Sequence, residues 1–375
     1  MHYTLHLTNR CNLRCDYCYV ERGETDMSVE TARAAVDLAG RGAKRAGIIF
    51  FGGEPLLRRA LILDTVAAAR RREQEGNCRY FFKITTNGIL LDDDFLAFAR
   101  REGLFIALSL DGLRASHDAH RKDAQGCGTY DRVSETARRL LKVKPYSPVL
   151  MTVRPDTLRG YADGVEALFG LGFAYVIASM DYSADWRDEH LPELERQYER
   201  LAKLYERKTL KEEKFYFSPF EVKISSHVNN RTYCHERCEL GLRQLSVGPD
   251  GSLYPCVQFV RDPAFCVGDV RSGIDEAKRQ ALYAYNEQEK PGCDRCGIRA
   301  RCNHYCACLN RQATGSIDVV SPMLCAHERI VLPIADRLAE RLYARGSALF
   351  IQKQYNDFYP LVSLAEDAVG CAAGE

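Results

Sequence analysis

The sequence predicts an α/β protein with a parallel sheet, followed by a cysteine-rich second part. Three observations lead to this prediction. Strand-like apolar runs alternate with helix-like segments six times over about the first 215 residues. Turn-forming glycines follow several of these runs, and the sixteen cysteines gather mainly in residues 11–18 and 234–325. Repeated βα units of about 30–40 residues favour a parallel barrel or an open parallel sheet.

The six units follow one another along the chain. Period-two and fully apolar runs predict strands at residues 3–8, 48–51, 81–86, 105–110, 149–153 and 175–179. Helical spacing predicts helices at residues 28–44, 61–72, 92–101, 130–141, 160–169 and 188–209. Ser28, Asp92 and Thr129 are suitable N-caps for three of these helices.

Length and charge narrow the class of protein. A chain of 375 residues is long enough for two domains, and we expect a barrel in 1–215, a cysteine-rich domain in 216–330, and a C-terminal helix and tail in 331–375. The net charge of +1 gives no electrostatic case for binding nucleic acid or a membrane. No signal peptide or membrane span is recognisable, so a cytoplasmic location is predicted. Reduced thiols in that compartment favour metal ligation over disulfides.

The first cysteine set follows the first predicted strand. Cys11, Cys15 and Cys18 have the spacing CxxxCxxC, which suits a loop that wraps one iron–sulfur cluster. A cubane takes one thiolate per iron, so three cysteines leave one iron open for a second ligand. A three-cysteine zinc site is the alternative, although structural zinc sites usually show two separated CxxC pairs.

With Tyr17 as the aromatic residue before the third cysteine, this motif resembles the signature of the radical S-adenosylmethionine (SAM) enzymes. The resemblance implies a partial (β/α)6 TIM barrel and a [4Fe-4S] cluster on Cys11, Cys15 and Cys18. It implies that SAM occupies the open iron and yields a 5′-deoxyadenosyl radical, which abstracts a hydrogen atom from a substrate. It also implies an electron donor such as a flavodoxin or ferredoxin.

Further residues match the SAM-binding elements of that family. Gly52-Gly53-Glu54-Pro55 follows the second strand and resembles the element that holds the SAM amino group. Glycines permit close backbone approach to a ligand, and Pro55 biases Glu54 towards an extended conformation. Ser109 and Arg121 match contacts to the SAM ribose and carboxylate, and a guanidinium suits a carboxylate. Simple βα turns and a solvated arginine are the alternative interpretations.

The second cysteine set resembles the SPASM extension of radical SAM proteins. Its residues 249–251 predict the turn of a β-hairpin, and residues 330–343 predict an apolar-striped helix. The resemblance implies two auxiliary [4Fe-4S] clusters, giving three in all. Auxiliary I would use Cys234, Cys238, Cys256 and Cys306; auxiliary II would use Cys293, Cys296, Cys302 and Cys325. Cys308 competes with Cys306, Cys234 is either a ligand or leaves an iron open, and two zinc ions are an alternative.

Proteins of this subgroup mostly modify peptides or proteins. We therefore predict a radical SAM peptide maturase that forms a thioether in a ribosomally made, cysteine-containing peptide, helped by a separate leader-peptide-binding protein. An anaerobic sulfatase-maturating (formylglycine-forming) enzyme is the alternative, but Cys256-Val257-Gln258 lacks the carboxylate that those enzymes carry after this cysteine. A zinc-binding interaction protein is the alternative from another class. The catalytic base stays unassigned, with Asp181 and Tyr182 as candidates by position.

Overall fold

The computed structural model describes residues 1–76, 78–229 and 239–363. Its main element is a nine-stranded sheet with the order β7-β6-β5-β4-β3-β2-β1-β8-β9. The first six strands are β1 (His2–His6), β2 (Arg45–Phe51), β3 (Arg79–Thr86), β4 (Phe105–Ser109), β5 (Pro148–Val153) and β6 (Tyr175–Met180). All six are parallel and adjacent in chain order, which is the arrangement of a partial (β/α)6 barrel.

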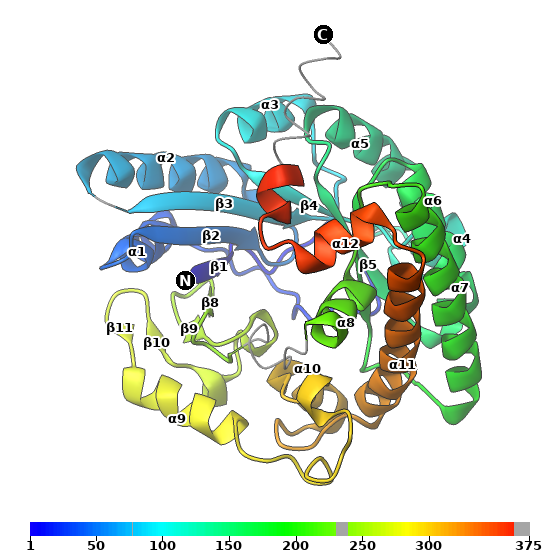
Figure 1. Cartoon of the computed structure of the whole chain (residues 1–375). Coiled ribbons are helices and arrows are strands. Elements are labelled where there is room, and N and C mark those ends of the chain that lie inside the picture. Colours follow the sequence, from blue (N-terminus) through cyan, green and yellow to red (C-terminus); the bar gives the residue numbers. More distant parts are fainter. Residues whose placement is uncertain (77, 230–238, 364–375) are drawn as a thin grey trace.

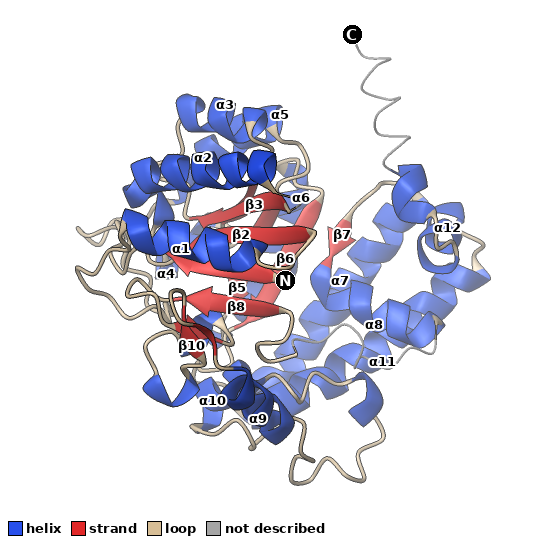
Figure 2. Ribbon diagram, turned by 90° about the vertical axis from the view of Figure 1, so that its left-hand side faces the viewer, coloured by secondary structure: helices blue, strands red, loops and turns tan. Residues whose placement is uncertain are grey.

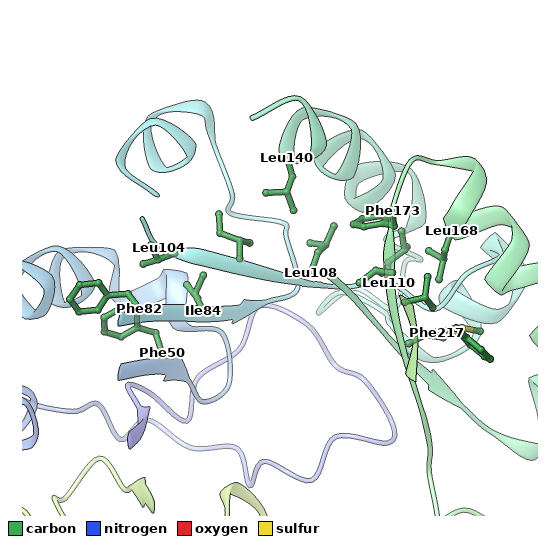
Figure 3. Packing of buried hydrophobic residues seen from close by; sticks show 14 of the residues in the cluster. Phe50, Phe82, Ile84, Leu104, Leu108, Leu110, Leu140, Leu168, Phe173 and Phe217 are labelled. Carbon is green, nitrogen blue, oxygen red and sulfur yellow. The ribbon is translucent and has the colours of Figure 1, made fainter. Parts of the chain in front are cut away.

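Helices cover the outer face of this sheet (Figures 1 and 2). They are α1 (Val29–Gly40), α2 (Arg59–Glu75), α3 (Asp93–Arg101), α4 (Arg114–His120), α5 (Tyr130–Val143), α6 (Tyr161–Gly170) and α7 (Leu191–Leu210). Apolar side chains from strands and helices meet between the two layers (Figure 3). Leu108 and Leu140, for example, are fully buried there.

Most predicted elements are present, and the differences have local causes. The helix expected at 28–44 ends at Gly40, because Gly42 turns the chain with a φ of +66° and lets β2 begin at Arg45. Ser28 and Asp92 cap their helices as predicted. Thr129 precedes α5 but donates its hydroxyl to the carbonyl of Arg121 instead of capping.

The cysteine-rich part continues the same sheet. The predicted hairpin is present as β8 (Gln244–Val247) and β9 (Leu253–Tyr254). Strand β8 pairs in parallel with β1, with His2 opposite Gln244, so this hairpin extends the barrel sheet. The remaining elements are β10 (Gly268–Asp269), β11 (Gly273–Ile274), α9 (Glu276–Asn286) and α10 (Ala307–Thr314).

The C-terminal elements pack back on the barrel. Strand β7 (Tyr216–Phe217) pairs with β6, and helix α8 (Ser218–Val228) follows it. Helix α11 (Pro322–Ala344) packs on α7 and α8, and α12 (Ala348–Tyr355) follows. The predicted helix at 330–343 is therefore part of a longer one that runs through residue 330. The division into three domains stays a prediction. Every helix in the described ranges is too short or too polar to cross a bilayer.

Candidate functional site

A cavity of about 620 Å³ lies where the carboxyl ends of the barrel strands meet the cysteine-rich part. Such strand ends are where parallel α/β folds usually place their chemistry. The cavity is lined by all of the residues predicted for the SAM site and by both candidate bases: Cys11, Cys15, Tyr17, Cys18, Gly52, Gly53, Glu54, Ser109, Arg121, Asp181 and Tyr182. The structure thus brings together side chains that the sequence separates by up to 171 positions.

Gly52 and Gly53 allow the second strand end to approach the chain just before the cysteine loop. A Cβ on Gly52 would lie 2.4 Å from the Thr8 carbonyl oxygen, and one on Gly53 would lie 2.1 Å from that of Arg10. Gly52 also has a φ of +126°, which favours glycine. The Gly53 amide donates to the Thr8 carbonyl at 2.8 Å, and the Glu54 amide donates to the Arg10 carbonyl at 2.9 Å. The predicted close approach is therefore made to the chain itself, where it positions the loop.

Glu54 is almost fully buried at the cavity wall. Its carboxylate accepts hydrogen bonds from the Leu56 amide, the Thr86 hydroxyl and the Asn87 amide at 2.8–3.0 Å. Burial raises the pKa of Glu54 to about 7, and these hydrogen bonds offset part of that increase. Glu54 thus fixes the end of β3 and places a titratable carboxyl beside the cysteine loop.

Asp111 connects three segments around the cavity. Its carboxylate accepts from the Tyr17 hydroxyl at 2.5 Å, from Arg121 Nε at 2.9 Å and from the Thr152 amide at 2.9 Å. Burial alone would lower the pKa of Arg121, but the neighbouring Asp111 carboxylate outweighs this and raises it. Arg121 therefore stays cationic beside Cys15. From the sequence alone Asp111, which precedes Gly112, reads only as a turn residue, because its partners are distant in the sequence.

Two more contacts hold the cysteine loop in place. His120 Nδ1 lies 2.9 Å from a carboxylate oxygen of Asp16, inside the CxxxCxxC motif. Asn87 donates to Asn12 Oδ1 at 2.8 Å and lies 3.8 Å from Cys11 Sγ. The loop is thus held from β3 and from the end of α4, although it has little regular structure of its own.

The three thiols of this loop lie close enough together to influence one another's ionisation. Cys15 interacts electrostatically with Cys11 and Cys18. Nevertheless, within the described ranges no three His, Cys, Asp or Glu side chains converge tightly enough to hold one metal ion. A cubane distributes its thiolates over separate irons and needs no such convergence. Burial raises the pKa of Cys15 to about 11, so ligation would release protons.

The second cysteine set forms two further groups. The Cys308 thiol hydrogen-bonds to Cys256 and Cys306, which lowers the pKa of both. In the other group, Cys293 interacts electrostatically with Cys296 and Cys325, and Cys302 interacts with Cys325. The first group contains the described cysteines predicted for auxiliary I together with Cys308, and the second contains those predicted for auxiliary II; which thiols bind a cluster stays a prediction. Cys234 and Cys238 lie outside the described residues.

The far wall of the cavity carries polar side chains that sequence analysis missed. Lys223 from α8 and Glu328 from α11 form a buried ion pair with an Nζ–Oε2 distance of 2.5 Å. His327 lies beside them, with Nδ1 2.8 Å from the Tyr182 hydroxyl and Nε2 2.6 Å from the Tyr198 hydroxyl. These helices carry no motif, so only the fold shows that the three residues face the cysteine loop across one cavity.

The two candidate bases differ in their surroundings. Asp181 Oδ2 accepts from Arg154 at 2.7 Å, and Oδ1 accepts from the amide and hydroxyl of Ser183. Both carboxylate oxygens of Asp181 are thus engaged by neighbouring side chains and backbone. The Tyr182 hydroxyl lies 2.8 Å from His327 Nδ1, and Tyr182 lines the cavity.

Comparisons with known proteins agree with this geometry. The profile described as "Radical SAM superfamily" matches residues 5–168. A cysteine-type anaerobic sulfatase-maturating enzyme of Clostridium novyi is 26% identical over 278 residues, which are 68% of this chain and 72% of that protein. The structure titled "Native anSMEcpe with bound AdoMet" superposes with a TM-score of 0.79 at 18% identity, covering 92% of this chain and all of that one. Streptococcus suis SuiB bound to precursor peptide SuiA gives a TM-score of 0.61 at 15% identity, covering 86% of this chain and 75% of SuiB.

The two structural matches show a shared fold. Residues 5–168 therefore match the radical SAM domain, and the chain is similar in sequence to the anaerobic sulfatase-maturating enzymes.

Proposed function

We propose that the protein uses SAM-derived radical chemistry to modify a ribosomally made, cysteine-containing peptide, forming a thioether. The single observation that supports this most is the cavity, which gathers the three-cysteine loop, the predicted SAM contacts and a polar far wall. The fold is shared with SuiB, whose structure holds a precursor peptide, and with anSMEcpe, solved with a Cp18Cys peptide. A cavity of this volume accommodates SAM-sized ligands and part of a peptide.

The chain's own residues would have the following roles. Cys11, Cys15 and Cys18 would hold the [4Fe-4S] cluster, which supplies the electron that cleaves SAM. Arg121, kept cationic by Asp111, would bind the SAM carboxylate through its planar donors. Glu54 would face the SAM ammonium group, and Ser109 would contact the ribose. Tyr17 packs against Arg121, whose guanidinium carbon lies 5.3 Å from the ring centroid, and it would keep that arginine in position.

Asp181 and Tyr182 remain the two base candidates, and both line the cavity. The Asp181 carboxylate is engaged by Arg154 and Ser183, and the Tyr182 hydroxyl hydrogen-bonds to His327. Besides Glu54 and Asp181, Glu328 also brings a carboxyl group to the cavity wall, where it is paired with Lys223. A thiol with a free pKa of about 8.5 needs such a proton acceptor when it bonds to carbon at neutral pH.

Formylglycine formation is the second candidate, because the relative from Clostridium novyi is a cysteine-type sulfatase-maturating enzyme. The residue after Cys256 is Val257 rather than a carboxylate. However, Glu328 brings a carboxylate to the same cavity from another helix. For both reactions, this proposal includes two auxiliary clusters, an external electron donor, a leader-peptide-binding partner and a cytoplasmic location.

The test is anaerobic incubation of the reconstituted protein with SAM and dithionite, followed by mass spectrometry. We expect 5′-deoxyadenosine from the wild type. We then expect a cysteine peptide to lose two hydrogens while keeping its sulfur, which indicates a crosslink. Loss of two hydrogens together with replacement of that sulfur by oxygen would indicate formylglycine instead. A protein with a full iron complement that cleaves no SAM would contradict both.

A further inference from the structure

The four thiols predicted for auxiliary II lie between the main cavity and the protein surface. Cys302 is at the inner end, because the next residue, Asn303, lines the cavity. Cys296 is at the outer end, because the residue before it, Arg295, has a side chain that is 96% exposed. Four thiolates are one for each iron of a cubane, so these residues fit a [4Fe-4S] cluster that lies between the cavity and the surface.

The charges on the inner side of these thiols oppose each other. Lys223 and Glu328 form the buried ion pair of the cavity wall, with 2.5 Å between Nζ and Oε2. Burial is the main reason that the pKa of Cys302 is raised, to about 12; Glu328 adds to the increase and Lys223 opposes it. The pair as a whole therefore brings little net charge to the inner thiol.

Arg329 is the cation on the outer side. It lies one turn after Cys325 on helix α11, so the two side chains share one face of that helix. Its Nη2 atom donates to Cys296 Sγ at 3.6 Å, and its guanidinium also hydrogen-bonds to Cys325. No carboxylate within residues 1–76, 78–229 and 239–363 forms an ion pair with it. Arg329 thus directs its charge at two thiols that are far apart in the sequence.

Two neighbouring arginines differ from Arg329, because they are paired with carboxylates. Arg299 lies 2.5 Å from Glu289, and Arg301 lies 2.6 Å from Asp336. The charge of each is therefore offset by its partner, whereas the charge of Arg329 faces thiols. At the outer end of this group, Arg329 is the arginine placed to influence the electrostatics of the sulfur atoms.

We propose that Arg329 raises the reduction potential of the cluster on Cys293, Cys296, Cys302 and Cys325, so that this cluster accepts an electron from the cavity. A cluster becomes more negative when it is reduced. Hydrogen bonds and charge at its sulfur atoms set its potential, and a hydrogen bond from a cation is stronger than one from a neutral donor. Arg329 therefore stabilises the reduced form more than the oxidised form.

The electron has a defined source in the proposed reaction. The 5′-deoxyadenosyl radical takes one hydrogen atom from a peptide carbon. Formation of the carbon–sulfur bond then releases the thiol proton to a base and one electron to the cluster, so the peptide loses two hydrogens in all. This source of the electron rests on the proposed function, whereas the effect of Arg329 on the potential does not require a peptide.

A purely structural role for Arg329 is the alternative. In that case the arginine holds the segment around Cys296 on helix α11, and its loss lowers the iron content without a change in the potential of any cluster that forms. A second alternative is that Arg329 is exposed and its charge is screened by solvent. Its loss would then change neither the iron content nor the potential.

The test is a redox titration of the anaerobic, reconstituted holoenzyme, monitored by electron paramagnetic resonance without any peptide. The signal to follow is the one that the wild type shows and Cys302→Ala lacks. Its oxidised-to-reduced ratio is measured at the wild-type midpoint potential for Arg329→Gln and Arg295→Gln, and iron is determined on the same samples. Arg295 precedes Cys296 and extends into solvent, so its variant controls for the loss of an exposed charge close to the same thiols.

We expect Arg329→Gln to keep the wild-type iron content and to raise the oxidised-to-reduced ratio by about three- to tenfold, a fall in potential of about 30–60 mV for a one-electron couple. Arg295→Gln should change the ratio by less than about twofold, because solvent screens its charge. A loss of iron from Arg329→Gln, an unchanged ratio, or equal changes in the two variants would overturn the inference. If Cys302→Ala lacks no signal, the four thiols hold no cluster and the inference is wrong, whereas the proposed peptide chemistry is judged separately by its product.

Discussion

The two cysteine sets differ in their position relative to the cavity. Cys11, Cys15 and Cys18 line it, and Cys18 is exposed. The described cysteines of the second set are not among the residues that line it. Cys256 belongs to a small apolar cluster of its own, and Cys296 is contacted by Arg329 at 3.6 Å. The first set thus borders a cavity with room for a further ligand, whereas the described thiols of the second set do not line it. We therefore expect the two sets to differ in function.

The largest expected effect on SAM cleavage comes from removing a thiol of the first cysteine set (Cys11, Cys15 and Cys18). Cys15→Ala should reduce 5′-deoxyadenosine formation at least a hundredfold, because the cluster that cleaves SAM would lose a ligand. Mass spectrometry of anaerobic reactions measures this. Cys127→Ala is the matched control, since Cys127 is an exposed thiol outside the cavity, and it should keep wild-type activity. Equal loss in both variants would contradict the comparison.

The next effect concerns fold stability and the residues that hold the first cysteine set in place. Asp111→Asn should destabilise the fold by about 3–5 kcal/mol, because it leaves the buried Arg121 without its counter-charge. Urea unfolding monitored by circular dichroism measures this. Asp131→Asn removes an exposed partner of Arg114 and should cost no more than about 1 kcal/mol. Similar costs for the two variants would show that Asp111 does not organise the loop.

SAM affinity should depend on pH through Glu54, whose pKa is raised to about 7. The SAM ammonium group favours the ionised carboxylate, so binding below pH 7 must first displace a proton. Affinity should fall about tenfold per pH unit below 7 and level off above it. Equilibrium dialysis with labelled SAM between pH 5.5 and about 8 tests this. Glu54→Gln should bind more weakly and without that slope; a wild type that shows no slope would remove Glu54 from the SAM site.

The smallest effect on SAM cleavage is expected from replacing a thiol of the second cysteine set. Cys302→Ala should lower the iron content from about twelve to about eight per chain, because one of three cubanes is lost. Peptide-independent SAM cleavage should stay within about twofold of wild type, since Cys302 is not among the residues that line the cavity. Iron analysis and deoxyadenosine assays on one preparation measure both. Loss of all cleavage activity would mean that the two sets are not independent.

Sequence reasoning succeeded where the signal is local. The six parallel strands, the caps Ser28 and Asp92 and the hairpin at 249–251 follow from patterns within about ten neighbouring residues. The candidate SAM-site residues could be named because they lie in short motifs, most of which follow a strand. Their position around one cavity fits the rule that parallel strands end at the same edge of a sheet, and their roles stay predictions.

Contacts between residues far apart in the sequence, or between residues that belong to no motif, could not be predicted. The pairing of β8 with β1 joins residues that no local pattern relates. Asp111 reads as a turn residue, although its carboxylate binds Tyr17, Arg121 and Thr152. Lys223 and Glu328 lie on ordinary amphipathic helices, and only the packing of α8 on α11 makes them a pair.

The position of β1 has a consequence for how the protein is made. This strand is completed by β2 on one side and by β8 on the other, so one of its edges has no partner until residue 247 leaves the ribosome. An unpaired strand edge is a site of aggregation, and late pairing of distant segments slows folding. We expect the nascent chain to need chaperone protection over this interval. Release of a truncated chain that ends before β8 should give insoluble protein, even though it contains the whole radical SAM domain.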